Sequence, residues 1–309
     1  MSVVQAIRAS MKVMPGDARL EITRQPRRDF PVWHFAMVND ASRNETIERS
    51  IASMDLKGKT VVEIGSGTGL IALLFAKYGA DRVVTCEMNA NLVDVARRVI
   101  ASTEYADRIH IINESSTVAI ERGLLPLLPD VIFTETLDCG VVGEGFMSIA
   151  EDIRKLAGPE TVVMPRLITQ TAALIHCESL ANLNRAGTAC GFDLRLLNEY
   201  ATGNYFPAHT ELHHHSLLCE PVKQRDYAYL DCPKPEIHKV RVQRAGAVHG
   251  VLSWFAADFG TAVVSNAPYS GSHWHQAFHP LPEEVHVEED DEVSMQIDDD
   301  GFAWVTRER

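Results

Sequence analysis

The sequence predicts an α/β domain followed by a mainly β domain, and three observations support this prediction. Between residues 60 and 164, short β-branched runs alternate with amphipathic segments of helical spacing. A glycine-rich turn directly follows the first of these runs. After Pro165, strand-like runs follow one another through turns rich in glycine, proline and asparagine, without regular helices between them. Alternating strands and helices imply right-handed crossovers and a mostly parallel, Rossmann-like sheet covered on both faces.

The first domain is expected to comprise residues 1–164. Its predicted strands are residues 60–64, 82–87, 108–112, 131–135 and 161–164. Residues 69–79 and 91–102 carry apolar side chains at helical spacing and are predicted to be helices. Residues 17–53 form a predicted helical lead-in, in which residues 31–51 follow a helical period.

The second domain, residues 165–309, is expected to be a barrel-like β domain. Its predicted strands are residues 167–178, 215–220, 238–243, 251–259 and 283–288. Residues 179–200 have a helical pattern and would form an excursion from the sheet. The acidic stretch 283–300 is expected to be a solvated strand edge or turn rather than a binding tail.

Composition and charge restrict the possible partners. The chain is 46% hydrophobic and 23% charged, and no apolar run is long enough to cross a membrane. A net charge of -13 repels nucleic acid and is compatible with a cationic substrate. The six cysteines form no C-x-x-C pair, which indicates free thiols in a reducing compartment. We therefore expect a cytoplasmic protein without nucleic-acid or membrane partners.

The strongest local signal is the segment VVEIGSGTGL, a buried strand followed by Gly65, Gly67 and Gly69. Glycines at a strand-to-helix turn let a ligand lie against bare main chain. The G-x-G-x-G spacing differs from the G-x-G-x-x-G of dinucleotide-binding domains. Glu87 ends the next strand, where its carboxylate can accept both ribose hydroxyls of a nucleoside. A glycine turn that serves packing alone is the alternative.

Other residues add to this cofactor site. Glu63 precedes the first glycine and is expected to order the loop and help place the cofactor. The combination is typical of class I methyltransferases, so S-adenosyl-L-methionine is the predicted cofactor and S-adenosyl-L-homocysteine its product. Arg43 is a candidate for binding the methionyl carboxylate, with a surface salt bridge as the alternative. Glu114 and Ser116 lie where the adenine would rest.

The segment FTETLDCGVVGEGF predicts the acceptor site. It carries Glu135 and Glu144 nine residues apart, with Gly140, Gly143 and Gly145 in or beside the loop that joins them. A guanidinium stays protonated in water and offers a fork of N–H donors that two carboxylates can clamp. Next to a methyl donor, such a clamp would orient one guanidine nitrogen for in-line displacement.

Other chemistries fit less well. The Asn/Asp-Pro-Pro-aromatic motif of amine and nucleobase methyltransferases is absent from this position. Paired carboxylates can also hydrolyse glycosides, but nothing else in the sequence favours that reaction. The cluster HTELHHH at 209–215 lacks cysteines at ligand spacing, so a solvated loop is expected there and no metal site is predicted.

The chain resembles the protein arginine methyltransferase family over nearly its whole length. WHFAMVNDASRN resembles the family's N-terminal cofactor-covering helix and contains Met37, Asp40 and Arg43. TETLDCGVVGEG resembles its double-glutamate loop. SNAPYSGSHWHQAF resembles its Thr-His-Trp loop, with Ser272 in place of threonine.

The resemblance implies roles for individual residues. Glu135 and Glu144 would bind the guanidine group. His273 would pair with Asp40, and both would assist catalysis. Trp274 would wall the acceptor pocket, to which the cofactor-covering helix would contribute Met37. A β-barrel domain with a helical arm at about 177–205 would form a homodimer.

Within this family the W-H-x-x-M and G-E-G sequences look most like the monomethylating branch. Its members carry two tandem modules and this chain has one, and only 35 residues follow Trp274. No substrate-docking domain is visible, which favours free L-arginine over protein-bound arginine as the substrate. The alternatives are a protein arginine methyltransferase, a methyltransferase for another amine or hydroxyl, and a non-catalytic cofactor-binding interaction module.

Overall fold

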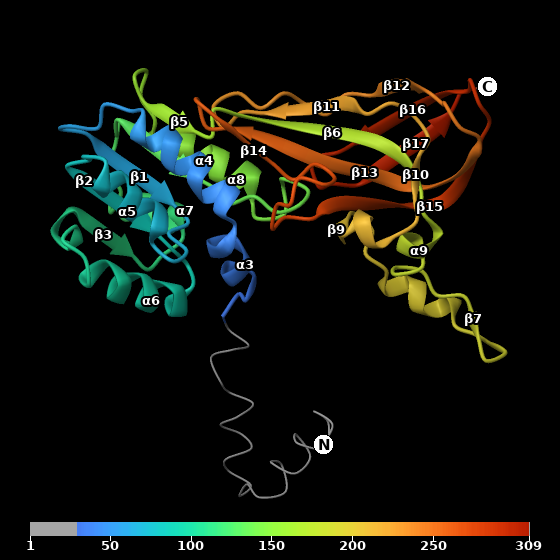
Figure 1. Cartoon of the computed structure of the whole chain (residues 1–309), viewed down its shortest axis with the longest axis horizontal. Helices are drawn as coiled ribbons and strands as arrows, with labels where there is room; N and C mark the ends of the chain where they lie inside the picture. The colour runs from blue at the N-terminus through green and yellow to red at the C-terminus, as the bar shows by residue number, and fades with distance from the viewer. Residues whose placement is uncertain (1–29, 309) are drawn as a thin grey trace, which may run out of the picture.

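The computed structural model describes residues 30–308, which form an α/β half and a β half joined end to end (Figure 1). Of the predicted helical lead-in, residues 17–29 lie outside the described residues. The described part forms two helices, α3 (Trp33–Asn39) and α4 (Ala41–Ala52). Asp40 separates them because its side chain accepts a hydrogen bond from the Arg43 backbone N–H and so caps α4.

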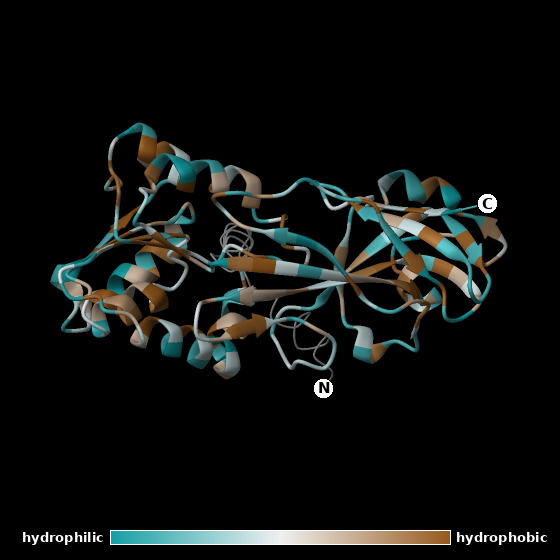
Figure 2. Ribbon diagram, turned by 90° about the horizontal axis from the view of Figure 1, so that it is seen from above, coloured by the Kyte–Doolittle hydropathy of each residue, from teal (hydrophilic) through white to brown (hydrophobic). Residues whose placement is uncertain are grey.

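The α/β half contains the predicted parallel sheet. Its strands are β1 (Thr60–Ile64), β2 (Arg82–Cys86), β3 (Ile109–Ile112), β4 (Val131–Thr134) and β5 (Val162–Met164). The intervening segments are α5 (Leu70–Lys77), α6 (Ala90–Ala101), η2 (Ala106–Arg108), α7 (Ser116–Glu121) and α8 (Phe146–Leu156). The helices lie on both faces of the sheet (Figure 2). The strand order is β3-β2-β1-β4-β5, so the chain reverses direction across the sheet between β1 and β4. Ligands of such sheets bind at the carboxyl ends of the strands at this switch point.

The β half contains two sheets. The larger one has the order β10-β6-β13-β15-β9, with β11 paired to β6 and β14 to β13. Its strands are β6 (Leu167–His176), β9 (Phe206–Ala208), β10 (Ser216–Leu217), β11 (Val222–Tyr227), β13 (Gly246–Asp258), β14 (Val263–Ser265) and β15 (Gln276–Val287). The smaller one has the order β12-β16-β17, from β12 (His238–Arg241), β16 (Glu292–Ile297) and β17 (Ala303–Arg307). A shared apolar core joins the two sheets, so the β half is barrel-like. No strand pairing among the described residues closes the two sheets into a complete barrel.

The acidic stretch 283–300 differs from the prediction of a solvated edge or turn. It contains the end of β15 and the whole of β16, and β16 is the central strand of the smaller sheet. Val293, Met295 and Ile297 are buried, while the residues between them face outward. The acidic residues that flank these alternating buried side chains predict a solvated segment, although one face of β16 belongs to the core.

The excursion after β6 is present, but it is not the continuous helix that the pattern at 179–200 predicts. It comprises α9 (Glu178–Ala181), a hairpin of β7 (Thr188–Ala189) and β8 (Phe192–Asp193), and the 3-10 segment η3 (Arg195–Tyr200). Cys190 and Gly191 both adopt positive φ and turn the chain back on itself. The tip of this arm extends away from the sheets (Figure 1).

The two halves share one core. Phe133 on β4 stacks on Phe259 after β13, with ring centroids 5.8 Å apart. Phe146 on α8 stacks on Tyr229 at 4.6 Å. These contacts hold the β half against β4 and α8. Within residues 30–308, no helix combines the length and the apolar character needed to cross a membrane.

Candidate active site

A cavity of about 960 Å³ lies where the two halves meet, a volume typical of small-ligand sites. The turns after β1, β2 and β4, the helix α3 and the loop before β15 all contribute to its lining. Most of the residues predicted to form the site line it. These are Met37, Arg43, Gly65, Gly67, Glu87, Glu114, Ser116, Glu135, Glu144, His273 and Trp274. The fold therefore brings the predicted cofactor and acceptor residues into one cavity.

The glycine turn forms one wall of this cavity. Gly65 and Gly67 have φ of +87° and +50°, values that side-chain-bearing residues rarely adopt. A Cβ on Gly67 would touch the imidazole of His34 on α3, so this helix lies directly over the turn. Gly69 is different, because it faces α6 and a Cβ there would meet Ala96 at 3.3 Å. Gly69 therefore allows helix packing and does not line the cavity, unlike the role predicted for it.

Glu87 is held at the cavity by main-chain donors. One carboxylate oxygen accepts from the Gly67 N–H at 3.1 Å, and the other accepts from the Asn89 N–H at 2.8 Å. These bonds tie the acidic end of β2 to the glycine turn. The carboxylate keeps further acceptor positions for hydroxyl groups in the cavity, as a ribose would require.

Arg43, Glu63 and Glu135 form a buried charged group beneath the cavity. Arg43 pairs with Glu135, and both side chains are almost fully buried. The Arg43 Nε and the Glu63 Oε2 have no hydrogen-bond partner in the described structure. Burial raises the pKa of Glu63 to about 8, with the negative charge of Glu87 adding to the effect. Arg43 lines the cavity, so its guanidinium can bind the carboxylate of an amino acid such as the methionyl end of S-adenosyl-L-methionine. Glu63 is buried and lies outside the lining, and its unpaired Oε2 supports the prediction that it helps place the cofactor.

Glu114 and Ser116 are already engaged within the protein. Glu114 pairs with Arg122, and the Ser116 hydroxyl donates to Asp152 on α8 at 2.8 Å. Asp152, which is 1% exposed, also accepts from Thr117 and was not recognised as part of the site. It fixes the start of α7 against α8. The sequence does not reveal this function of Asp152, because its partner Ser116 lies 36 residues earlier in the chain.

The two predicted acceptor carboxylates differ in their surroundings. Glu135 is buried beside Arg43, whereas Glu144 is open to the cavity. Protein still surrounds Glu144 on its other sides, and the loss of hydration raises the pKa of this carboxyl to about 7. The negative charges of Glu135 and Asp138 contribute further. A bound guanidinium would restore the charged form of Glu144, so the site is suited to a cationic acceptor.

The loop between these glutamates is held by Asp138 and Tyr205, neither of which the sequence analysis identified. Asp138 accepts from the N–H groups of Gly140 and Gly143, both at 3.1 Å. Its second oxygen accepts from the Tyr205 hydroxyl at 2.8 Å. A Cβ on Gly140 would come within 2.5 Å of the Tyr205 ring, and a Cβ on Gly143 would meet the Asp138 carboxylate and the Tyr205 hydroxyl. The glycines therefore make room for a tyrosine that enters from the β half.

The predicted pairing of His273 with Asp40 is present. The His273 Nδ1 lies 2.9 Å from the Asp40 carboxylate, which also accepts from the His273 N–H at 3.0 Å. Burial would raise the pKa of Asp40, but the hydrogen bonds from Arg43 and His273 outweigh it and lower the pKa. Burial lowers the pKa of His273, although the bond to Asp40 opposes this shift. The pair is thus an ionised aspartate that orients a neutral imidazole.

Trp274 completes the acceptor side. Its indole Nε1 donates to the Leu137 carbonyl at 2.7 Å, and its ring packs edge-on against Phe255. The Arg43 guanidinium lies 5.9 Å from the ring centroid. Trp274 therefore joins the loop before β15 to the double-glutamate loop and forms a wall between them.

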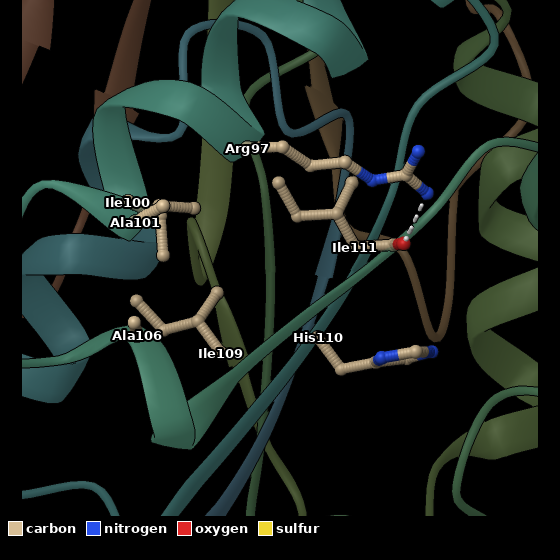
Figure 3. Close-up of a pocket in the computed structure, with 7 residues that line it drawn as sticks. All are labelled: Arg97, Ile100, Ala101, Ala106, Ile109, His110 and Ile111. Carbon is tan, nitrogen blue, oxygen red and sulfur yellow. Dashed lines mark hydrogen bonds between the residues drawn. The ribbon is translucent and has the colours of Figure 1, made fainter.

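A second, smaller hollow is separate from this cavity. A hollow of about 250 Å³ lies between α6 and β3 and includes Arg97 and His110, but none of the predicted site residues (Figure 3). Arg97 there donates to the Ile111 carbonyl at 3.0 Å. Throughout residues 30–308, no three histidine, cysteine or acidic side chains are placed to hold a metal ion.

Comparison with known proteins identifies the family. Residues 180–301 match the arginine methyltransferase oligomerization subdomain. The chain is 34% identical over 277 residues to an arginine N(omega)-methyltransferase of Streptomyces achromogenes subsp. streptozoticus, covering 88% of this chain and 77% of the relative. The chain belongs to the protein arginine methyltransferase family. Membership accounts for the shared position of the glycine turn, the double-glutamate loop and the His273–Trp274 pair around one cavity.

More distant family members share the fold. The chain is 24% identical to protein arginine N-methyltransferase 9 of Mus musculus, covering 85% of this chain but only 36% of that relative. The Trypanosoma brucei PRMT1 enzyme-prozyme complex with AdoHcy superposes with a TM-score of 0.72 at 18% identity, covering 86% of each chain. The crystal structure of PRMT6 superposes with a TM-score of 0.68 at 19% identity, covering 92% of this chain and 100% of that one. The predicted combination of a Rossmann-like sheet with a barrel-like β domain is thus confirmed.

Proposed function

We propose that this protein is an S-adenosylmethionine-dependent methyltransferase that adds one methyl group to a terminal guanidine nitrogen of free L-arginine. One observation carries the proposal. Glu135 and Glu144 flank a loop in the same cavity as the glycine turn and Glu87, so a guanidinium-binding pair lies beside a nucleoside-binding site. Among the described residues, no group of three histidine, cysteine or acidic side chains is placed to hold a metal ion in this cavity.

Different residues would bind the cofactor and the acceptor. Arg43 and Glu63 would hold the methionyl carboxylate and ammonium, and Glu87 the ribose. When bound, S-adenosyl-L-methionine supplies an electrophilic methyl group on its sulfonium. Glu144 and Glu135 bind the guanidinium and direct one nitrogen at that methyl group, so positioning and charge provide most of the rate.

A proton must leave the guanidinium as the new N–CH₃ bond forms. We assign its removal to the His273–Asp40 pair. The ionised Asp40 accepts from the Nδ1 side of the imidazole, which leaves Nε2 as the acceptor nitrogen. The lowered pKa keeps His273 neutral and able to take the proton at neutral pH.

One comparison supports free arginine as the acceptor. The Streptomyces relative, which matches over most of its length, is named for arginine, whereas the relatives from Mus musculus and Aedes aegypti are named for protein arginine. Monomethylation follows from the resemblance of the G-E-G and W-H-x-x-M sequences to the monomethylating branch.

The test is mass spectrometry of purified protein incubated with S-adenosyl-L-methionine and equal amounts of free L-arginine and an arginine-rich peptide. We expect free arginine to gain one methyl group and the peptide to stay unmodified. Modified peptide with untouched arginine would replace the small-molecule assignment by a protein substrate. A second methyl group would overturn monomethylation.

A homodimer formed through the arm is part of the proposal. The arm carries apolar side chains that are open to solvent in the single chain, among them Phe192 at 71%, Leu196 at 79% and Tyr200 at 84% exposure. Apolar groups clustered in this way are typical of an interface. The match of residues 180–301 to an oligomerization subdomain agrees with this. Sedimentation analysis should give twice the chain mass, and Leu196→Glu should reduce it.

A further inference from the structure

Two histidines contact each other at the acceptor side of the cavity. His275 lies just before β15 and His209 just after β9, and the two strands pair with Gln276 opposite Ala208. The imidazole centroids are 3.3 Å apart. His275 is half-buried and lines the cavity, whereas His209 is exposed. The pair is thus accessible to a ligand rather than enclosed in the core.

Hydrogen bonds place His275 beside the double-glutamate loop. The Asn266 side-chain nitrogen donates to the His275 carbonyl at 2.7 Å and to the Cys139 carbonyl at 3.3 Å. The preceding residue, Trp274, donates to the Leu137 carbonyl. Residues 274–275 therefore run alongside residues 137–139, between the two acceptor glutamates. His275 and both glutamates line the same cavity, so an amino acid whose guanidinium is held by the glutamates shares that cavity with the His275 imidazole.

The histidine pair differs from most of the charged side chains around the cavity, which are acidic. Glu87, Glu114, Asp138 and Glu144 contribute negative charge to the lining, and Arg43 is engaged by Glu135. A free amino acid that enters guanidinium-first also carries an α-carboxylate, which such a lining would repel. Each imidazole offers one N–H when neutral and two when protonated, so this pair can bind an anion in either state.

Glu211 is the acidic group near the pair. Its carboxylate accepts from the Tyr269 N–H at 2.9 Å and keeps its negative charge. Burial lowers the pKa of His275, and the neighbouring His209 and His273 lower it further, whereas the charge of Glu211 raises this pKa and favours the protonated imidazole. A carboxylate bound beside His275 would favour its protonated form and so oppose this lowering of its pKa.

We propose that His275, supported by His209, binds the α-carboxylate of the acceptor amino acid and so selects free arginine. This inference rests on the proposed function and identifies the residues that would give it its specificity. A peptidyl arginine lacks that carboxylate and would leave the pair without its ligand. His275 is therefore a specificity-determining residue rather than a catalytic one.

The experiment compares arginine with two analogues, agmatine, which lacks the α-carboxylate, and argininamide, in which that group is neutral. For the unaltered protein we expect kcat/KM to be about 10-fold or more higher for arginine than for either analogue. His275→Phe should lower kcat/KM for arginine about 10-fold and leave agmatine unchanged. His275→Gln, which keeps one N–H donor, should recover part of the loss. His110→Phe, at the separate hollow in Figure 3, is the matched control and should change neither substrate.

The outcomes separate this inference from the proposed function. Equal use of arginine and agmatine by the unaltered protein would overturn the carboxylate site while leaving arginine methylation intact. An equal loss for both substrates in His275→Phe would mean that the residue only supports the fold. Methylation of arginine peptides but of none of the three small acceptors would refute free arginine as the substrate, and this inference with it.

Discussion

The cofactor and acceptor sides of the cavity are built in different ways. The cofactor side comes mainly from one continuous segment, in which the turn after β1 is tied to Glu87 at the end of β2 by the Gly67 N–H. The acceptor side is assembled from segments far apart in the chain. Asp40 meets His273, and Asp138 meets Tyr205, across 233 and 67 residues respectively.

This difference predicts which substitutions should disturb each side of the cavity. Contacts within one segment form with little loss of chain entropy, so the cofactor side should depend mostly on its own residues. The acceptor loop depends on groups in the β half and should respond to changes there. Arg43 belongs to both sides, because it pairs with Glu135 and also lines the cavity, with a buried Nε that has no hydrogen-bond partner in the described structure.

The largest effect should come from Glu144→Gln, which keeps the shape of the side chain but removes its charge. We expect kcat/KM for the acceptor to fall by about 100-fold or more, because the guanidinium would lose one of its two carboxylates. Affinity for S-adenosyl-L-methionine, measured by calorimetry, should remain unchanged. Glu135→Gln makes the comparison sharper, because it should weaken both acceptor turnover and cofactor affinity through Arg43.

The same glutamate should set the acid limb of the pH profile. Its pKa in the unliganded protein is about 7, and only the ionised form attracts a guanidinium. In the unaltered protein kcat/KM should therefore rise with pH up to about 7 and then level off. An identical acid limb in Glu144→Gln would assign it to another group and contradict this role.

The next largest effect should come from Tyr205→Phe, which removes the hydroxyl that donates to Asp138 while preserving the ring against Gly140. The loop would lose one bond to a carboxylate, so we expect KM for the acceptor to rise and kcat to fall, together by about 10-fold. Cofactor affinity should not change. Tyr105→Phe in the α/β half is the control.

A merely structural role for Tyr205 would give a different pattern. Acceptor and cofactor parameters would then decline together with the melting temperature. If Tyr205→Phe retained full turnover with an unchanged KM, the acceptor loop would hold its shape without the β half. The inference that the acceptor side depends on the β half would then be wrong.

The fold was predictable to the extent that local patterns determine it. The five parallel strands appear where β-branched runs occur, because such strands are buried on both faces. β16 was missed because acidic residues surround its buried Val293, Met295 and Ile297. The arm was predicted as a helix because its apolar spacing does not reveal the turn at Cys190 and Gly191.

The site followed the same division. Glycines and acidic residues next to strand ends indicated the cofactor side, since the chain brings them together locally. On the acceptor side, the motif around Glu135 and Glu144 indicated a carboxylate clamp, whereas His273 was found through family resemblance. Tyr205 and His275 gain their meaning only from contacts with residues distant in sequence. The nearest sequence signal was the three glycines around Glu144, two of which accommodate the Tyr205 side chain.

A comparable effect, measured on the cofactor, should follow from Gly65→Ala. The φ of +87° is unfavourable for alanine, and the new Cβ would lie 2.9 Å from the Thr136 side chain. We expect affinity for S-adenosyl-L-methionine to fall about 10-fold, as the glycine turn shifts. Gly58→Ala is a matched control, because Gly58 also has positive φ but nothing lies within 4 Å of its Cβ position. Equal effects of the two substitutions on cofactor binding would mean that backbone strain alone is responsible.

The smallest effect concerns stability and arises from Glu63, buried beneath the glycine turn. Its pKa of about 8 in the folded protein lies above the ordinary value of 4.5, so the folded state binds the extra proton. Stability from this group is complete below about pH 4.5 and is lost as pH rises towards 8, with a slope of up to about 1.4 kcal/mol per pH unit. Glu63→Gln removes that loss, so its melting temperature relative to the unaltered protein should increase from pH 6 to pH 9. Because an ammonium beside Glu63 would favour its ionised form, saturating S-adenosyl-L-methionine should reduce this difference. A difference that is the same at every pH and with or without the cofactor would remove Glu63 from the cofactor side of the site.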